Sequence, residues 1–488
     1  MKSNAYIGKI VLYKTYRQIE FMSISEERNP QYDTLYPDCG KVRPMSAGFA
    51  KFRDPLMKLG EKFAQNKTLQ ILRDAFMLAF PLTIFGSITL VIANFPFLDK
   101  ILGEQGAATL NALLGPASTA TMSIATVFTV LGIGYYFSKD RKCDPIFGAA
   151  ISLAAFIMIT PMEVEHVLED GTAVMVGSVL AIDRLGARGM FVGMLAAFLA
   201  AFLYCWITKK NWTIKMPASV PPAVSKSFSA LIPACLTLTV FLAVRIGFTF
   251  TPWGNIHDFI YELVQAPLTS LGSSLIATLL AIFSIQILWF FGLHGQIIVN
   301  SVLDPIWNTL TMENLMAFQA GEALPNIVTK QFIEIFTVGI GGSGMTLAAV
   351  IILAFFCRSR QLKQMGRLAL PAACFNINEP IIFGLPIVLN PTILIPWILA
   401  PVINVCIVYF AMATGLVPLT TGVTVPWTTP IFLSGMLATN SWQGGVIQLV
   451  ELAVVFVCWL PFLKALDRTA LQSDIQEEDD SVFDLGDE

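Results

Sequence analysis

The stretch at residues 374–391 reads Cys-Phe-Asn-Ile-Asn-Glu-Pro-Ile-Ile-Phe-Gly-Leu-Pro-Ile-Val-Leu-Asn-Pro, and it decides how the chain is organised. Pro380, Pro386 and Pro391 each lack the N–H that a helix interior needs, and each disfavours helical geometry in the residue before it. These residues therefore cannot form one continuous span, and we expect a broken or re-entrant segment. At membrane depth the N–H and C=O groups of a broken helix must form hydrogen bonds with protein or with water in a cavity. The stretch is therefore expected to line a polar cavity.

Glu379 is the carboxylate of this stretch, and Asn376 and Asn378 precede it closely. An ionisable residue inside a membrane segment is expensive and indicates a functional site by default. Two structural roles stay open on chemistry alone, because the carboxylate could pair with an arginine or lie in a loop at the membrane interface. Arg245, inside another apolar run, is a possible charge partner for some acid.

The composition predicts a membrane protein. Of the 488 residues, 55% are hydrophobic and 13% are charged, whereas about a quarter of an ordinary soluble domain is charged. The net charge of −3 indicates no nucleic-acid partner. Eight scattered cysteines without a CxxC pair and three histidines indicate no metal site, and we expect no cofactor. No Walker A loop is present, so an ATP-driven pump is not expected.

Apolar runs long enough to cross a bilayer occur ten times. They lie near residues 75–96, 119–137, 145–160, 189–208, 229–251, 272–293, 297–316, 332–357, 392–414 and 444–465. Lysines and arginines collect at 51–73, 139–142, 209–215 and 358–367, which alternate spans place on one side, and the positive-inside rule makes that side cytosolic. We therefore predict an all-α polytopic protein of the cell membrane, with about ten transmembrane helices, re-entrant hairpins and both termini in the cytosol.

The polar interruptions predict a division of the chain. Residues 1–44 read as a poorly ordered leader, 45–215 as an N-terminal scaffold bundle, and 216–228 as an interfacial linker rich in Pro and Ser. Residues 229–466 hold the polar interruptions and read as a substrate-transport bundle, followed by an acidic cytosolic tail at 467–488. This asymmetry is typical of transporters that move one bundle against another.

Two further segments are candidates for ligand contacts. His294 lies between Gly292 and Gly295 at the end of an apolar run, where glycine permits close approach and imidazole offers one donor and one acceptor. Trp427, Thr428 and Thr429 supply an aromatic ring and hydroxyls of the kind that sugar sites use. An interfacial histidine and an aromatic belt are the competing interpretations. The glycine-rich run 339–344 is interpreted as a packing surface, with Ser343 a weak candidate.

The same residues carry a resemblance to a known family. The chain resembles subunit IIC, the membrane permease, of the lactose/cellobiose type in the bacterial phosphoenolpyruvate-dependent sugar phosphotransferase system. The matching blocks, which together span about residues 45–466, are 66–76, 81–87, 219–228, 289–295, 375–386 and 425–430. The Asn-Glu-Pro sequence of residues 378–380 is the most specific of them.

The resemblance implies a homodimer whose first bundle makes the dimer contact and whose second bundle carries a β-linked disaccharide across the membrane. It implies that Glu379 and His294 act at the sugar hydroxyl that becomes phosphorylated, and that Asn376, Asn378, Gly295, Trp427, Thr428 and Thr429 contact the sugar. The phosphoryl donor would be a separate phospho-cysteine IIB subunit, itself served by IIA, so no catalysis by this chain alone is expected. Cellobiose, chitobiose, lactose and manno-oligosaccharides remain open as substrates.

Two rival hypotheses follow from the same residues. A proton-coupled sugar symporter would use Glu379 as its proton carrier. A non-transporting sugar sensor would need affinity but no base, and the presence of both Glu379 and His294 argues against it.

Overall fold

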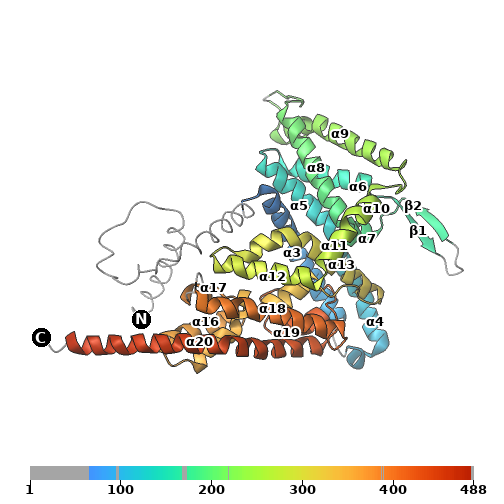
Figure 1. Cartoon of the computed structure of the whole chain (residues 1–488). Helices are drawn as coiled ribbons and strands as arrows, with labels where there is room; N and C mark the ends of the chain where they lie inside the picture. The colour runs from blue at the N-terminus through green and yellow to red at the C-terminus, as the bar shows by residue number, and fades with distance from the viewer. Residues whose placement is uncertain are drawn as a thin grey trace.

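The structure is a computed structural model that describes residues 65–94, 98–167, 173–217, 219–385, 387 and 390–484. Helices make up most of this part, and Figure 1 shows them in two packed groups. The prediction of a helical, multi-span fold is confirmed. The predicted leader at 1–44 lies outside the described residues.

The first group packs around α5, which contacts α3, α6 and α8. Small residues allow this close packing: a Cβ on Gly132 would lie 2.7 Å from Cα of Ala75, and one on Gly134 would lie 2.6 Å from the carbonyl oxygen of Gly148. The elements of this group are α3 (Lys67–Ala93), α4 (Leu98–Ser118), η1 (Thr119–Ser123), α5 (Ala125–Asp140), α6 (Pro145–Ile159), β1 (Glu163–Val167), β2 (Ala173–Gly177), α7 (Ile182–Leu185), η2 (Ala187–Gly189), α8 (Met190–Lys209) and α9 (Pro222–Phe248).

A short β-hairpin is the departure from the predicted all-α fold. Strands β1 and β2 pair antiparallel, with Glu163 opposite Gly177 and Val167 opposite Ala173. The hairpin lies between α6 and α7, outside the predicted spans at 145–160 and 189–208, so the spans themselves are not strands.

The start of α6 illustrates how local sequence sets a helix end. The carboxylate of Asp144 accepts hydrogen bonds from the N–H groups of Ile146 and Phe147, and it pairs with Lys226 of α9 at 3.1 Å. Burial would raise the pKa of Asp144, but Lys226 and the two N–H groups hold it below its ordinary value. Asp144 therefore caps α6 and ties α9 to it.

Arg245 has a different partner from the one that the sequence suggested. In the part of the chain that the structure describes, its guanidinium donates to the carbonyl oxygens of Met158 at 2.5 Å and Thr160 at 3.0 Å, not to a carboxylate. These carbonyls end α6, where helix geometry leaves acceptors unsatisfied and the helix dipole favours a cation. Among the described residues a helix terminus thus satisfies this charge, and the possible acidic partner is not observed there.

The second group is built around α18 and α20, which pack against each other. Trp397 of α18 and Trp459 of α20 are fully buried and meet edge to face, with ring centroids 6.5 Å apart. The elements α10 (Ile256–Ile260) and η3 (Tyr261–Gln265) contact α8 of the first group. The elements of the second group are α11 (Ala266–Gly272), α12 (Leu275–Phe290), α13 (Gly295–Ala320), α14 (Lys330–Ile333), η4 (Glu334–Val338), η5 (Ser343–Met345), α15 (Thr346–Ile351), η6 (Ile352–Phe356), α16 (Arg360–Ala373), α17 (Glu379–Gly384), α18 (Pro391–Ala413), α19 (Leu433–Thr439) and α20 (Trp442–Asp484).

The predicted number of ten spans is not confirmed. By length and composition, the described residues contain seven helices able to cross a membrane, or up to eight if the pair Ile256–Gly272 and Leu275–Phe290, bent by 70°, is one span. The predicted span at 145–160 corresponds to the shorter apolar helix α6. The predicted span at 297–316 corresponds to α13, whose Asp304 and Glu313 lower its hydropathy.

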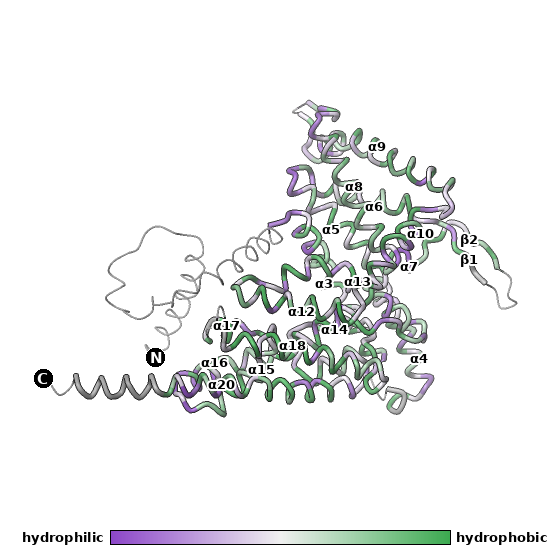
Figure 2. Tube along the Cα trace, viewed as in Figure 1, coloured by the Kyte–Doolittle hydropathy of each residue, from purple (hydrophilic) through white to green (hydrophobic). Residues whose placement is uncertain are grey.

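Helix ends also differ from the predicted boundaries. Helix α9 begins at Pro222, inside the predicted linker, because proline suits a first helical turn. Helix α20 continues through the predicted acidic tail as far as Asp484. Figure 2 shows mostly hydrophobic residues along α9 and along much of α20, as membrane contact requires, and hydrophilic chain at the end of the molecule that holds α16, opposite β1 and β2.

Candidate functional site

The stretch at 374–391 is broken, as its prolines predicted. Helix α16 ends at Ala373, a turn follows, α17 is only six residues long, and α18 begins at Pro391. Asn376 adopts the left-handed conformation with φ 63°, which asparagine tolerates better than most residues. The turn therefore presents Asn376 and Asn378 in irregular backbone between α16 and α17.

A glycine-rich loop at residues 339–345 packs against this turn. Gly341, Gly342 and Gly344 have φ values of +85°, +82° and +74°, which favour glycine. A Cβ on Gly342 would also lie 2.6 Å from Cγ of Asn378. The glycines are thus required by the approach of the loop to the asparagines, and the interpretation of this run as mere helix packing is incomplete.

Asn376 joins three segments. Its Nδ2 donates to the carbonyl oxygens of Trp427 at 2.6 Å and Thr429 at 3.1 Å, and its Oδ1 accepts from the N–H of Gly341 at 2.7 Å. Its side chain is buried. Both amide hydrogens are used within the protein, so in this structure Asn376 positions the 427–429 segment.

A second chain of hydrogen bonds connects the turn to the predicted histidine hairpin. Nδ2 of Asn378 donates to the carbonyl oxygen of Ser343 at 3.0 Å, and Oγ of Ser343 donates to Oε1 of Gln296 at 2.6 Å. Gln296 follows His294 and Gly295 at the start of α13. Three segments far apart in the sequence are therefore in direct contact.

His294 caps the N-terminus of α13. Its Nδ1 accepts from the N–H of Ile297 at 3.3 Å, and its ring lies 4.4 Å from the Trp289 ring, centroid to centroid. An accepting Nδ1 indicates that a neutral imidazole carries its proton on Nε2, so Nε2–H is the donor of this ring. Gly295 is needed because a Cβ there would lie 2.1 Å from the carbonyl oxygen of Ile285.

The position of Glu379 is described only for its backbone. Glu379 is the first residue of α17 and directly follows Asn378. Its side chain lies outside the described residues, so the proposed meeting of its carboxylate with His294 stays a prediction. The network brings His294 and Gly295 to the loop that contacts Asn378.

The remaining predicted residues lie on one loop. Trp427 is exposed, with 41% of its surface accessible, while Thr428 and Thr429 are half-buried. The loop is held at other points: the N–H of Val425 donates to Oε1 of Gln331 at 2.9 Å, and that of Thr424 donates to Oγ of Ser87 at 2.7 Å. The loop therefore offers an exposed indole on a main chain that is fixed on several sides.

Gln296 and Ser343 are the residues of this network that sequence reasoning missed or undervalued. A serine among glycines and a glutamine after a histidine have no distinctive spacing. The one sequence feature that could have pointed to Gln296 was its position close to His294.

Changing Asn376 to Asp tests the positioning role. Asp keeps the acceptor for Gly341 and tolerates the backbone, but it loses both donations to the 427–429 carbonyls. We expect sugar affinity to fall about tenfold, the loss of roughly one or two net hydrogen bonds, measured by calorimetric titration. Asn211→Asp is the matched control, since Asn211 has φ 60° on an exposed loop. Unchanged affinity in Asn376→Asp would contradict the role.

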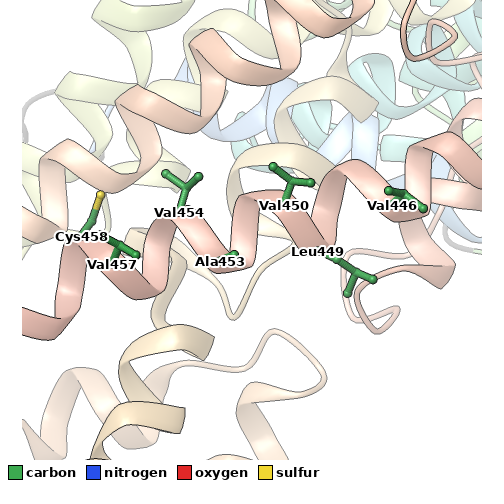
Figure 3. A pocket seen from close by; sticks show the side chains of 7 residues that line it. All are labelled: Val446, Leu449, Val450, Ala453, Val454, Val457 and Cys458. Carbon is green, nitrogen blue, oxygen red and sulfur yellow. The ribbon is translucent and has the colours of Figure 1, made fainter.

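A hollow on α20 is not a second polar site. Figure 3 shows its lining side chains along this one helix, namely Val446, Leu449, Val450, Ala453, Val454, Val457 and Cys458. These groups offer apolar contacts and a weakly polar thiol, so they do not suit a hydroxyl-rich ligand.

Comparison with known proteins identifies the family. The family model "Phosphotransferase system, EIIC" matches residues 73–401. The chain belongs to this family. The match includes His294, the glycine-rich loop and the Asn376–Glu379 turn, and it confirms the resemblance found in the sequence.

Individual EIIC relatives cover nearly the whole length. The chain is 55% identical over 429 residues to the oligo-beta-mannoside-specific EIIC component of Bacillus subtilis (strain 168), covering 88% of this chain and 96% of the relative. It is 40% identical over 443 residues to the cellobiose-specific EIIC component of Geobacillus stearothermophilus, covering 89% and 96%. The crystal structure of ChbC, the IIC component of an N,N'-diacetylchitobiose-specific phosphotransferase system, superposes with a TM-score of 0.81 at 39% identity, covering 86% and 98%.

Proposed function

We propose that this EIIC component binds a β-linked disaccharide from outside the cell and carries it across the membrane, where a separate phospho-cysteine IIB subunit phosphorylates it. The observation that supports this most directly is the hydrogen-bonded junction of the His294 hairpin, the glycine-rich loop and the Asn376–Asn378 turn. Donors, acceptors and an exposed indole at Trp427 suit a sugar, whose faces are apolar and whose edges carry hydroxyls.

The names of relatives support a choice of sugars to test. Relatives include components named for oligo-β-mannosides and cellobiose, and the solved structure is named for diacetylchitobiose. We propose a β-linked gluco- or manno-disaccharide, with β-mannobiose and cellobiose as the first sugars to titrate.

The two bundles have different proposed roles. Residues 45–215, with α9 packed against α6 and α8, would form the static scaffold and the homodimer contact, and the rest of residues 229–466 would carry the sugar. Among the described contacts of the proposed site, the bond between Thr424 and Ser87 reaches the first bundle, whereas the bonds of Asn376, Asn378 and Ser343 join residues of the second. A site built in this way can move as one body.

Glu379 and His294 have proposed roles at the reacting hydroxyl. The carboxylate of Glu379 would accept the proton of the sugar hydroxyl as that oxygen attacks the phosphorus of the IIB phosphocysteine, and the thiolate of IIB would leave. His294, held by the Ile297 N–H, would donate a hydrogen bond from Nε2 to orient the sugar.

The test is Glu379→Gln in proteoliposomes supplied with phosphorylated IIB. We expect sugar binding to stay within about tenfold of wild type, because Gln retains the shape and hydrogen bonding, while sugar phosphate formation falls by at least about a hundredfold with loss of the general base. Wild-type protein should ignore a proton ionophore. Accumulation of free sugar driven by a pH gradient alone would contradict the proposal and support a proton symporter.

A further inference from the structure

Helix α16 has a buried face and a basic face. Its buried residues Leu362, Gly366, Ala369 and Ala373 recur at helical spacing along one face. A Cβ on Gly366 would lie 2.4 Å from the backbone nitrogen of Ala354 in η6, so this face is in close contact with the protein. The face therefore supports the bundle and cannot insert into lipid.

A neighbouring face carries a basic stripe, which we define as Arg360, Lys363 and Arg367. These residues recur at i, i+3 and i+7, so they share one face of the helix. Arg360 and Arg367 are exposed and Lys363 is half-buried. Residues 358–373 contain four cationic side chains and no acidic one.

Helix α20 adds positive charge at the same end of the fold. The carboxylate of Asp467 accepts from the N–H groups of Arg358 and Ser359 at 2.9 Å, which fixes the start of α16 against α20. Asp467 is buried in this contact, whereas Arg468 beside it is exposed. Arg468 therefore adds a positive charge beside the start of α16, while the carboxylate of Asp467 is occupied by the α16 backbone.

The stripe leads toward the candidate site. Six residues separate Arg367 from Ala373, a helical rise of about 9 Å, and the Asn376–Glu379 turn follows directly. Figure 1 shows α16 and α17 at one end of the molecule, opposite the β-hairpin. A phosphate-bearing protein that contacts this stripe would lie beside the turn that precedes Glu379.

We propose that the basic stripe of α16 is the docking surface for the phosphorylated IIB subunit. This inference rests on the proposed function, which supplies the partner. A phosphoryl group is a dianion with three acceptor oxygens, and arginine recognises it through paired N–H donors. Charge complementarity of this kind chiefly raises the association rate and orients the partner.

The test measures binding and activity separately. Wild-type protein in nanodiscs is compared with the triple variant Arg360→Gln, Lys363→Gln, Arg367→Gln for binding of purified phosphorylated IIB by biolayer interferometry. We expect the Kd to rise about tenfold or more, mainly through a lower association rate. Wild-type Kd should also rise with ionic strength, because exposed charges are screened by salt.

The matched control is Lys209→Gln, Lys210→Gln, Lys215→Gln, which removes the same charge from the loop after α8. We expect its Kd for IIB to stay within about twofold of wild type. Sugar titration of both variants shows whether they are folded. Equal effects of the two triple variants would indicate general attraction and overturn the specific surface.

Other outcomes separate this inference from the proposed function. If IIB binding depends on the stripe but no sugar phosphate forms, docking stands and the proposed function fails. If the stripe variant binds phosphorylated IIB with the wild-type Kd and sugar is phosphorylated, the proposed docking surface is wrong. A difference that appears in nanodiscs with anionic lipid and vanishes in neutral detergent would also overturn the proposal, because the stripe would then bind lipid headgroups.

Discussion

Replacing Lys330 by Met is expected to lower the free energy of unfolding by about 3–5 kcal/mol, as when one partner of a buried ion pair is removed. The ammonium of Lys330 lies 2.5 Å from Asp304 of α13 and 3.4 Å from Glu334 of η4. The Lys330 side chain is only 11% exposed. Without it, two carboxylates would stay close together with no cation between them.

The flanking residues connect this charge cluster to the candidate site. Thr329 meets Thr420 at 2.7 Å between hydroxyl oxygens, and Gln331 accepts from the N–H of Val425. Both contacts hold the loop that carries Trp427. Lys330→Met should therefore also weaken sugar binding, although Lys330 itself is not proposed to touch the sugar.

Reversible unfolding in mixed detergent micelles measures the effect. Lys67→Met is the matched control, because Lys67 lies 3.7 Å from Asp140 but is 69% exposed, and we expect a change within about 0.5 kcal/mol. Asp304→Asn combined with Lys330→Met should be less destabilised than Lys330→Met alone, since one repelling carboxylate is neutralised. An equal loss in Lys330→Met and Lys67→Met would rule out the buried ion pair.

The second large loss of free energy of unfolding is expected for Gly344→Ala. The added Cβ would lie 2.3 Å from Cε3 and 2.4 Å from Cζ3 of Trp397, at a φ of +74°. Trp397 cannot move easily, because it is fully buried and its Nε1 donates to the carbonyl oxygen of Gln286. We expect a loss of about 1–2 kcal/mol from backbone strain and about 1–3 kcal/mol from overpacking.

Substitutions at two other glycines separate the cost of backbone strain from the cost of overpacking. Gly415 has φ +75° and no atom near an added Cβ, so Gly415→Ala reports the strain alone. Gly115 lies in helix α4 with open space around it, and Gly115→Ala should be neutral or slightly stabilising. If Gly344→Ala costs no more than Gly415→Ala in the same unfolding measurement, the contact with Trp397 carries no penalty.

The sequence predicted the parts of the fold that follow from local chemistry. The prolines at 380, 386 and 391 predicted the break between α16 and α18, and apolar runs predicted most of the spanning helices. The number of spans was harder, because residues 297–316 mix apolar and charged side chains. Asp304 in α13 pairs with Lys330, which lies 26 positions later, and no local pattern shows such a contact.

The candidate site was only partly predicted, because local patterns mark unusual residues but do not show long-range contacts. Unusual residues in apolar surroundings marked His294, Asn376 and Asn378, and the structure joins their segments. Ser343 and the glycines beside it were undervalued because glycine-rich runs in membrane helices usually serve helix packing. Their contacts with Asn378 depend on a chain reversal that spacing alone does not indicate. The carbonyl partners of Arg245 lie at a helix end, a contact that no sequence pattern shows.

The hydrogen bonds of Asn376 affect how sugar preference can change. Its amide bonds to main-chain atoms of Gly341, Trp427 and Thr429, and it does not bond to their side chains. Substitutions at 427–429 can therefore alter the surface offered to a ligand while the main chain keeps its position. A scaffold of this type is easily diversified, both by natural divergence among related permeases and by engineers who want to import a new oligosaccharide.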